Sequence, residues 1–260
     1  MNQLALLKSG LHIEQSVPAG KLIPLFQRLW PQVQDRPLVR IGAEHDGGYI
    51  CPEDFVGVKA CFSLGVGNTT AFESDLYRRY RLISHLADAS VNLNNATEFA
   101  GTFVKKYIGP QNGDETITFA EWISLVEPEF SGHEYIAQID IEGNEYLTLL
   151  ALEASIIQHF RVIIIEFHQI YNWANPIFFP IIDLLWKKFL TNYTVVHLHP
   201  NNNDGEVELI LGRCPRTIEV TLYRNDRISA PTRSANLPSI LDSKNNPTLP
   251  EVYIPEYWRS

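Results

Sequence analysis

The chain has 260 residues, of which 45% are hydrophobic, so it can bury one sizeable core as a single domain. A formal net charge of -9 argues against a nucleic-acid-binding protein, which needs clustered lysine and arginine. The three cysteines are widely spaced and form no CxxC pair, so neither a zinc knuckle nor a disulfide framework is expected, and the reduced cytoplasm is the expected compartment. We also expect no signal peptide and no transmembrane segment, because no apolar run approaches the roughly 20 residues that a membrane span needs.

The first predicted elements are a short helix and a hairpin. Residues 21–30 have an apolar face at helical spacing, and we assign residues 1–38 to an N-terminal helical extension. Asp46-Gly47-Gly48 predicts a tight turn between two short strands. The segment is either only a hairpin or, because His45, Asp46 and Tyr49 bring polar groups to it, a loop that contacts a substrate or cofactor.

A glycine turn follows, on which the rest of the chain is organised. Residues 61–70 predict a strand and a turn with Gly65 and Gly67, and a helix is expected over residues 71–80. Such a turn lets a ligand press against bare backbone at a helix N-terminus. The next strand ends at Asp88, about 20 residues on, where a βαβ nucleotide-binding unit has the carboxylate that binds ribose hydroxyls. Asp88 could instead cap a helix, and the third glycine typical of nicotinamide-dependent dehydrogenases is missing.

Strands and helices alternate through the rest of the chain. Strands are predicted over residues 116–119, 135–140, 161–168, 194–199, 207–211 and 217–223, and helices over residues 120–126, 144–158 and 175–190. This alternation predicts an α/β fold with a doubly wound, mostly parallel seven-stranded sheet, which the last two strands close as a hairpin with one antiparallel strand. We expect this domain to span residues 39–227, and residues 228–260, rich in Pro, Ser and Asn, to form an extended tail.

Polar side chains gather where the predicted strands end, which is the edge at which open α/β sheets bind ligands. They are Ser63, Asp88, Asp140, Glu142, Glu166, His168, His197 and His199. Each has a possible structural role: Asp140 could cap the next helix, Glu166 could pair with an arginine, and His197 could be a hydrogen-bonded core histidine. Acids and imidazoles at one edge are costly unless they are solvated, paired or used, so we interpret the group as functional.

With these residues in place, the chain resembles a class I, S-adenosylmethionine-dependent methyltransferase, and more narrowly the FkbM family, over roughly residues 39–227. The matching stretches are Asp46-Gly47-Gly48-Tyr49, Phe62-Ser63-Leu64-Gly65-Val66-Gly67, Asp88, Ile139-Asp140-Ile141-Glu142-Gly143, Ile165-Glu166-Phe167-His168 and His197-Leu198-His199-Pro200-Asn201-Asn202. The Asp-Ile-Glu-Gly and His-Pro-Asn-Asn stretches are the specific ones. One departure is Ser63, since class I enzymes usually have an acid two residues before the first glycine.

The resemblance implies O-methylation of a sugar hydroxyl in a surface glycan or a secondary metabolite. It implies that S-adenosylmethionine is held by residues Ser63, Gly65, Gly67, Asp88 and Asp140, with Thr118 and Phe119 flanking the adenine. Related sugar O-methyltransferases hold a divalent metal such as Mg²⁺ with acids that end the fourth and fifth strands, and Asp140 and Glu166 match those places.

Methyl transfer to a hydroxyl requires alignment of the acceptor and removal of its proton. We expect His168 or His199 to be the base, and Asp140 and Glu142 to orient the acceptor. A bound metal would help, since it lowers the pKa of a coordinated hydroxyl. Two other functions remain open: a nucleotide-dependent oxidoreductase, and a non-catalytic glycan-binding module that retains the fold.

Overall fold

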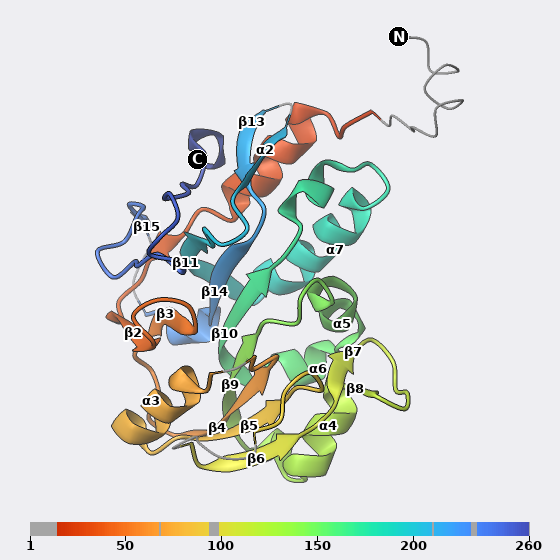
Figure 1. The fold of residues 1–260 in the computed structure, drawn as a ribbon, viewed down its shortest axis with the longest axis vertical. Helices are drawn as coiled ribbons and strands as arrows, with labels where there is room; N and C mark the ends of the chain where they lie inside the picture. The colour runs from red at the N-terminus through yellow and green to blue at the C-terminus, as the bar shows by residue number, and fades with distance from the viewer. Residues whose placement is uncertain (1–14, 68, 94–98, 210, 230–232, 260) are drawn as a thin grey trace.

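The computed structural model describes residues 15–67, 69–93, 99–209, 211–229 and 233–259, and the predicted α/β fold is confirmed (Figure 1). Its main sheet has seven strands in the order β11-β14-β10-β9-β4-β5-β6. Only β14 is antiparallel to its neighbours, β10 and β11; the remaining pairs are parallel. The strands are β4 (Val58–Leu64), β5 (Ile83–Ala87), β6 (Gly101–Val104), β9 (Glu134–Ile139), β10 (Phe160–Phe167), β11 (Tyr193–Pro200) and β14 (Ile218–Arg224).

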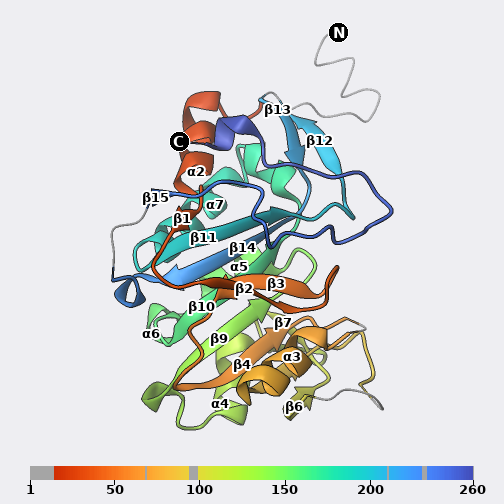
Figure 2. The same cartoon turned by 90° about the vertical axis from the view of Figure 1, so that its left-hand side faces the viewer.

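The two faces of the sheet have separate hydrophobic cores, because side chains alternate along each strand. Phe62 and Ile165 point to the face covered by α2 (Ala19–Arg28), α4 (Phe119–Val126), α5 (Glu145–Ala151) and α7 (Phe179–Leu190). Cys61 and Ile164 point to the opposite face, which is covered by α3 (Ala71–Tyr80) and by the hairpin of β2 (Leu38–Gly42) and β3 (Gly48–Pro52). Figure 2 shows this hairpin and α3 in front of the sheet. The predicted hairpin at residues 46–48 is therefore confirmed.

Two predicted strands lie outside the main sheet, so the expected closing hairpin is wrong. β12 (Glu206–Leu209) pairs with β13 (Gly212–Pro215), and β8 (Thr116–Thr118) pairs with β7 (Tyr107–Gly109). β14 inserts instead between β10 and β11, so its backbone is paired on both sides, and six of its seven residues are buried. In chain order, the third strand of the main sheet is β6. It is a partly exposed edge strand, and its sequence has no apolar run that would have predicted it.

The predicted helices differ mainly at their ends. Helix α3 has the predicted bounds, and Thr118 caps α4, with its Oγ1 accepting from the Glu121 N–H at 3.2 Å. The single helix expected over residues 144–158 is wrong, because the backbone becomes extended at Leu152 between α5 and α6 (Ala154–Ile157). Lys188 fills the break by donating to three carbonyl groups, those of Leu149, Leu150 and Leu152. Helix α7 begins at residue 179, after the 3-10 helix η2 (Ile170–Ala174).

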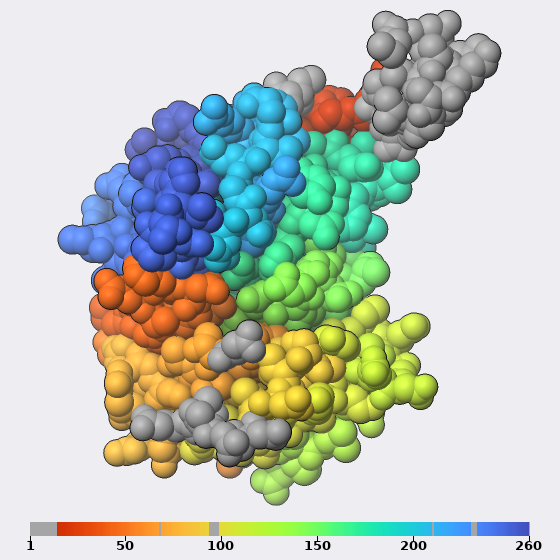
Figure 3. Space-filling view, in the orientation of Figure 1, coloured from red at the N-terminus to blue at the C-terminus, as the bar shows by residue number. Residues whose placement is uncertain are grey.

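The N-terminal and C-terminal segments pack against each other. Phe26 of α2 stacks on Trp258 at 4.2 Å between ring centroids, and β1 (Gln32–Val33) pairs with β15 (Arg233–Ser234). The tail has little regular structure: after β15 it forms several turns and bends, and it ends in the 3-10 helix η4 (Glu256–Trp258). Figure 3 shows the tail beside the β2–β3 hairpin, where the Asp46 N–H donates to the Asn245 carbonyl at 3.3 Å. The boundaries at residues 38 and 227 stay predictions, and residues 1–14 lie outside the described ones. In the described ranges, no helix is long and apolar enough to cross a membrane.

Candidate ligand cavity and acid–histidine cluster

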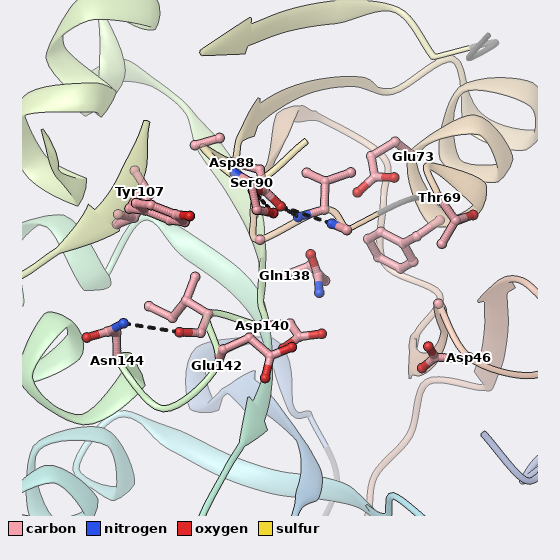
Figure 4. Close-up of a pocket in the computed structure, with 18 of the residues that line it drawn as sticks. Asp46, Thr69, Glu73, Asp88, Ser90, Tyr107, Gln138, Asp140, Glu142 and Asn144 are labelled. Atoms are coloured by element: carbon pink, nitrogen blue, oxygen red, sulfur yellow. Dashed lines mark hydrogen bonds between the residues drawn. The ribbon is translucent and has the colours of Figure 1, made fainter. Parts of the chain in front are cut away.

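A cavity of about 560 Å³ opens where β4, β5 and β9 end. This volume is in the usual range for small-molecule sites. β4 pairs with β5 on one side and with β9 on the other, so the cavity lies where the strand order reverses, the usual ligand position in such sheets. Figure 4 shows Asp88 and Ser90 at one end of the cavity, Asp140 and Glu142 at the other, and Gln138 between them.

The glycine turn forms one wall of the cavity, and Gly65 is required there by both conformation and space. Its φ is +75°, and a Cβ atom would lie 1.6 Å from the Asp140 carbonyl oxygen. Its N–H donates to the Ala87 carbonyl at 2.9 Å, so the turn joins the ends of β5 and β9. Gly67 has a φ of +57°, but a Cβ there would meet no atom within 4 Å. The close approach of backbones thus explains Gly65, and conformation alone explains Gly67.

Asp88 fixes the shape of this wall. Its Oδ2 accepts from the N–H groups of Val66 and Gly67, at 2.9 and 3.0 Å, and its Oδ1 accepts from the N–H and the hydroxyl of Ser90. Burial raises the pKa of Asp88, but these four hydrogen bonds outweigh it, and the pKa is lower than usual. Asp88 is therefore an ionised residue of the cavity wall. Its contact with a ribose stays a prediction.

His168 lies among carboxylates at the opposite end. Its Nδ1 is 3.0 Å from Glu145 Oε1. Its Nε2 is 3.3 Å from Glu142 Oε2, 3.7 Å from Asp140 Oδ1 and 3.9 Å from Glu166 Oε1. The structure thus brings four predicted site residues together in what we call the acid–histidine cluster: Asp140, Glu142, Glu166 and His168.

The backbone around this cluster is strained. Glu142 has a φ of +55° and Gln169, next to His168, has a φ of +58°, values that side chains with a Cβ rarely adopt. The turn at Glu142 leaves its side chain 85% exposed while its carboxylate faces His168. Such strain is common at functional sites, because the surrounding structure must hold it in place.

Burial and charge shift the protonation of the cluster. Burial lowers the pKa of His168, but the Glu145 hydrogen bond and the charges of Glu145, Asp140 and Glu142 outweigh it and raise the pKa to about 9. Burial also raises the pKa of Asp140 to about 7, although the positive charge of His168 opposes the shift. For Glu166, burial and then the charge of Asp140 raise the pKa. Burial thus favours the neutral forms of Asp140 and Glu166, whereas the carboxylates around His168 favour its protonated form.

The cluster could hold a divalent cation. One ligand atom each from Asp140, Glu142 and His168 lie within 4.8 Å of one another, and Asp140 Oδ1 is buried without a hydrogen-bond partner. If His168 Nδ1–H donates to Glu145, the Nε2 lone pair faces the carboxylates, which is how metal-binding histidines are commonly oriented. These donors suit Mg²⁺ or Mn²⁺. Glu166 is tied to Asn201 Nδ2 at 2.7 Å and lies at the rim of this set.

A second, more open cavity of about 240 Å³ adjoins the cluster. Glu142 and His168 line it together with Tyr171, Asp204 and Arg216. Glu142 also lines the larger cavity, so this residue stands between the two. Both cavities therefore have access to the acid–histidine cluster.

Several predicted site residues do not line the main cavity, among them Thr118, Phe119 and His199. Thr118 caps α4, and Phe119 is 2% exposed in the core. The neighbouring strand β7 instead presents Tyr107 and Ile108 to the cavity. His199 is buried near the tail, with Nδ1 3.7 Å from Asp242 Oδ1, and lines a separate cavity of about 100 Å³.

Sequence reasoning missed Glu73 and Gln138, which form a second buried polar group with Ser63 and Tyr49. Ser63 is fully buried behind the turn, where its hydroxyl bonds Glu73 Oε1 and lies 2.7 Å from Gln138 Oε1. Gln138 Nε2 donates to the Tyr49 hydroxyl at 3.1 Å. One signal in the sequence could have indicated this group. Gln138 is a polar residue within the apolar strand Tyr135-Ile136-Ala137-Gln138-Ile139, and a polar side chain at such a buried position needs a hydrogen-bond partner.

A scan against protein-family models found no match for this chain. A search of the curated proteins found no match either.

Proposed function

We propose that the chain is an S-adenosylmethionine-dependent O-methyltransferase that acts on a hydroxyl of a sugar or glycan. The observation that carries the proposal is one cavity with two chemically different ends. The glycine turn and Asp88 form the first end, and Asp140 and Glu142 of the acid–histidine cluster form the second. A nucleoside cofactor at the first end would direct its reactive group toward the acids and imidazole of the second.

The fold and the cavity wall support this cofactor. The seven-stranded sheet with one antiparallel strand is the fold that the resemblance to class I methyltransferases implies. Gly65 and Gly67 leave the wall free of side chains, as close approach of a nucleoside requires. A ribose hydroxyl would reach Asp88 by replacing one of its hydrogen bonds, and Tyr107 and Ile108 would flank the adenine in place of Thr118 and Phe119.

The second cavity supports a sugar acceptor. Tyr171 lines this cavity with an aromatic ring that has the Arg216 guanidinium over one face, and Asp204 and Arg216 offer polar groups for hydroxyls. An acceptor there would have its reacting hydroxyl beside Glu142 and His168. The sulfonium methyl group is already activated, so the chain has only to align this hydroxyl and accept its proton.

Neutral His168 is the histidine placed to accept that proton, because its Nε2 lies 3.3 Å from Glu142 Oε2, and Glu142 lines both cavities. With a pKa of about 9, this neutral form becomes available as the pH rises toward that value. Glu145 holds Nδ1, which fixes the ring, and Asp140 and Glu142 orient the hydroxyl. If the cluster holds a divalent cation, then Asp140, Glu142 and His168 would bind it, and His168 would act as a ligand in place of the base. That cation would supply Lewis acidity, which makes the hydroxyl easier to deprotonate.

The test is calorimetric titration with S-adenosylmethionine and S-adenosylhomocysteine, followed by a screen of nucleotide sugars and lipid-linked glycans with a labelled methyl donor. We expect both nucleosides to bind and label to appear on at least one sugar. If neither nucleoside gives binding heat, the cofactor proposal is wrong. Binding of a nicotinamide nucleotide instead would favour an oxidoreductase, and cofactor-free glycan binding would favour a binding module.

A further inference from the structure

Glu73 is a buried carboxylate that lines the main cavity. It lies in the first turn of α3, just after the glycine turn, and is 3% exposed. Figure 4 shows its side chain on the cavity wall, well apart from Asp140 and Glu142. Glu73 therefore belongs to neither end of the cavity described above.

The partners of Glu73 are neutral. Its Oε1 bonds the Ser63 hydroxyl, which continues to Gln138 and then to Tyr49. Among the described residues, no lysine, arginine or histidine forms a salt bridge with Glu73. Burial raises its pKa, with the Ser63 hydrogen bond only partly opposing this. A glutamine could make the same hydrogen bonds without the cost of burying an acid, so the acid itself needs a reason.

We propose that Glu73 binds the ammonium group of the amino-acid end of the cofactor. This inference rests on the proposed function. Ser63 stands where class I enzymes usually have an acid, and its hydroxyl bonds Glu73 from the next helix. The strand therefore lacks the usual acid, but the carboxylate of Glu73, from helix α3, lies beside the position that this acid would occupy. An ammonium against this carboxylate would satisfy the buried charge, as a cation beside a buried acid does.

The test compares two ligands on two proteins by calorimetry. S-adenosylhomocysteine has the amino-acid end, whereas methylthioadenosine has the adenosine and sulfur without it. In Glu73→Gln, the affinity for S-adenosylhomocysteine should fall about tenfold or more, the usual effect of losing a charged hydrogen bond. The affinity for methylthioadenosine should stay within about twofold, because only the ammonium contact is lost.

Glu121→Gln is the matched control. Glu121 is likewise an acid in the first turn of a helix, but it is exposed and does not line the cavity, so both ligands should bind this variant as they bind the wild type. If wild-type protein binds S-adenosylhomocysteine and Glu73→Gln binds it equally well, the role of Glu73 is overturned while the proposed function stands. If wild-type protein binds neither ligand, both are overturned.

A structure of the wild-type protein with S-adenosylhomocysteine gives a readout that does not depend on the folding of a variant. We expect the ligand nitrogen within about 3.2 Å of a Glu73 carboxylate oxygen. A nitrogen bound instead by Asp46 or Asp140, both of which line the cavity, would overturn the inference.

Discussion

Asp140 contacts both the glycine turn and the acid–histidine cluster. Its carbonyl oxygen lies against Gly65, and its carboxylate faces His168 Nε2 at 3.7 Å. The backbone position serves the glycine turn, whereas the side chain serves the acid–histidine cluster. A substitution that changes only the charge should therefore separate cofactor binding from catalysis.

Replacing Asp140 by Asn should lower methyl transfer by about 100-fold or more, because acid–base and orienting groups contribute at least that much. Affinity for S-adenosylhomocysteine should change by less than about threefold, since the backbone contact with Gly65 is kept. Single-turnover transfer and calorimetry measure the two effects. Asp114→Asn, at an exposed site, is the control. Normal turnover of Asp140→Asn would reject the assignment.

A divalent cation should raise the melting temperature of the wild-type protein. Cation binding to the native state at about 100 times its Kd stabilises by about 2.7 kcal/mol, or roughly 5–10 °C for a chain of this size. Glu142→Gln should lose most of this response, because Glu142 is one of the three expected ligands. Scanning calorimetry with Mg²⁺ or Mn²⁺ after treatment with chelator measures it. Equal responses of the two proteins would exclude the site.

At the residue scale, sequence reasoning found the acids and imidazoles that follow strands, such as Asp140 and His168. Strand ends can be read from apolar periodicity, and parallel strands end at one edge. It missed Glu73, since an acid in the first turn of a helix is ordinarily a favourable partner of the helix dipole. The hydrogen bond that makes Glu73 unusual joins residues ten positions apart and depends on how α3 packs.

At the element scale, the glycine turn places β4 between the ends of β5 and β9. The sequence predicted α3 with its bounds, because its apolar face has clear helical spacing. It missed β6, a four-residue edge strand whose pairing with β5 is set by tertiary contacts. The break between α5 and α6 was missed for the same reason, since Lys188 comes from a distant helix.

Gly65→Ala should be more harmful than Gly67→Ala. Both positions have positive φ, which costs about 1–2 kcal/mol for alanine. Only at Gly65 would the new Cβ meet backbone, at 1.6 Å from the Asp140 oxygen, so β4 and β9 would have to separate. Chemical unfolding should show a clearly larger loss of free energy of unfolding for Gly65→Ala, together with lost nucleoside binding. Similar losses in the two variants would contradict this account of the turn.

At the scale of the whole molecule, the C-terminal tail completes the polar edge of the sheet. The carboxylate of Asp242, in this tail, lies 2.8 Å from His197 Nε2 and 3.7 Å from His199 Nδ1, both on β11. Asn245 Nδ2 donates to Glu219 Oε1 at 2.7 Å, on the strand between β10 and β11. Buried polar groups of β11 and β14 thus find partners in a segment more than 20 residues away, which sequence patterns do not reveal.

The tail contact should make stability depend on pH. Burial lowers the pKa of His199, but the carboxylates of Asp242 and Glu219 outweigh it and raise the pKa. Protonated His199 therefore stabilises the fold fully below the unfolded histidine pKa of about 6.5, and this contribution is lost as the pH rises through the higher folded value. The pKa of Asp242 is lowered, so its contribution persists until the solution becomes acidic.

Asp242→Asn should consequently reduce the free energy of unfolding by about 1–3 kcal/mol at pH 6, and by less at pH 9. Denaturant unfolding at the two values of pH measures the difference. Glu256→Gln, an exposed acid in the same tail, should have little effect at either. A loss that is equal at both values, or larger at pH 9, would contradict the pairing of Asp242 with protonated His199.

The most direct test of the central claim is a crystal structure of the protein with S-adenosylhomocysteine. We expect the adenosine to lie over Gly65 and Gly67, its ribose beside Asp88, and its sulfur directed toward Asp140 and Glu142. A nucleoside bound elsewhere, or with its sulfur turned away from these acids, would contradict it.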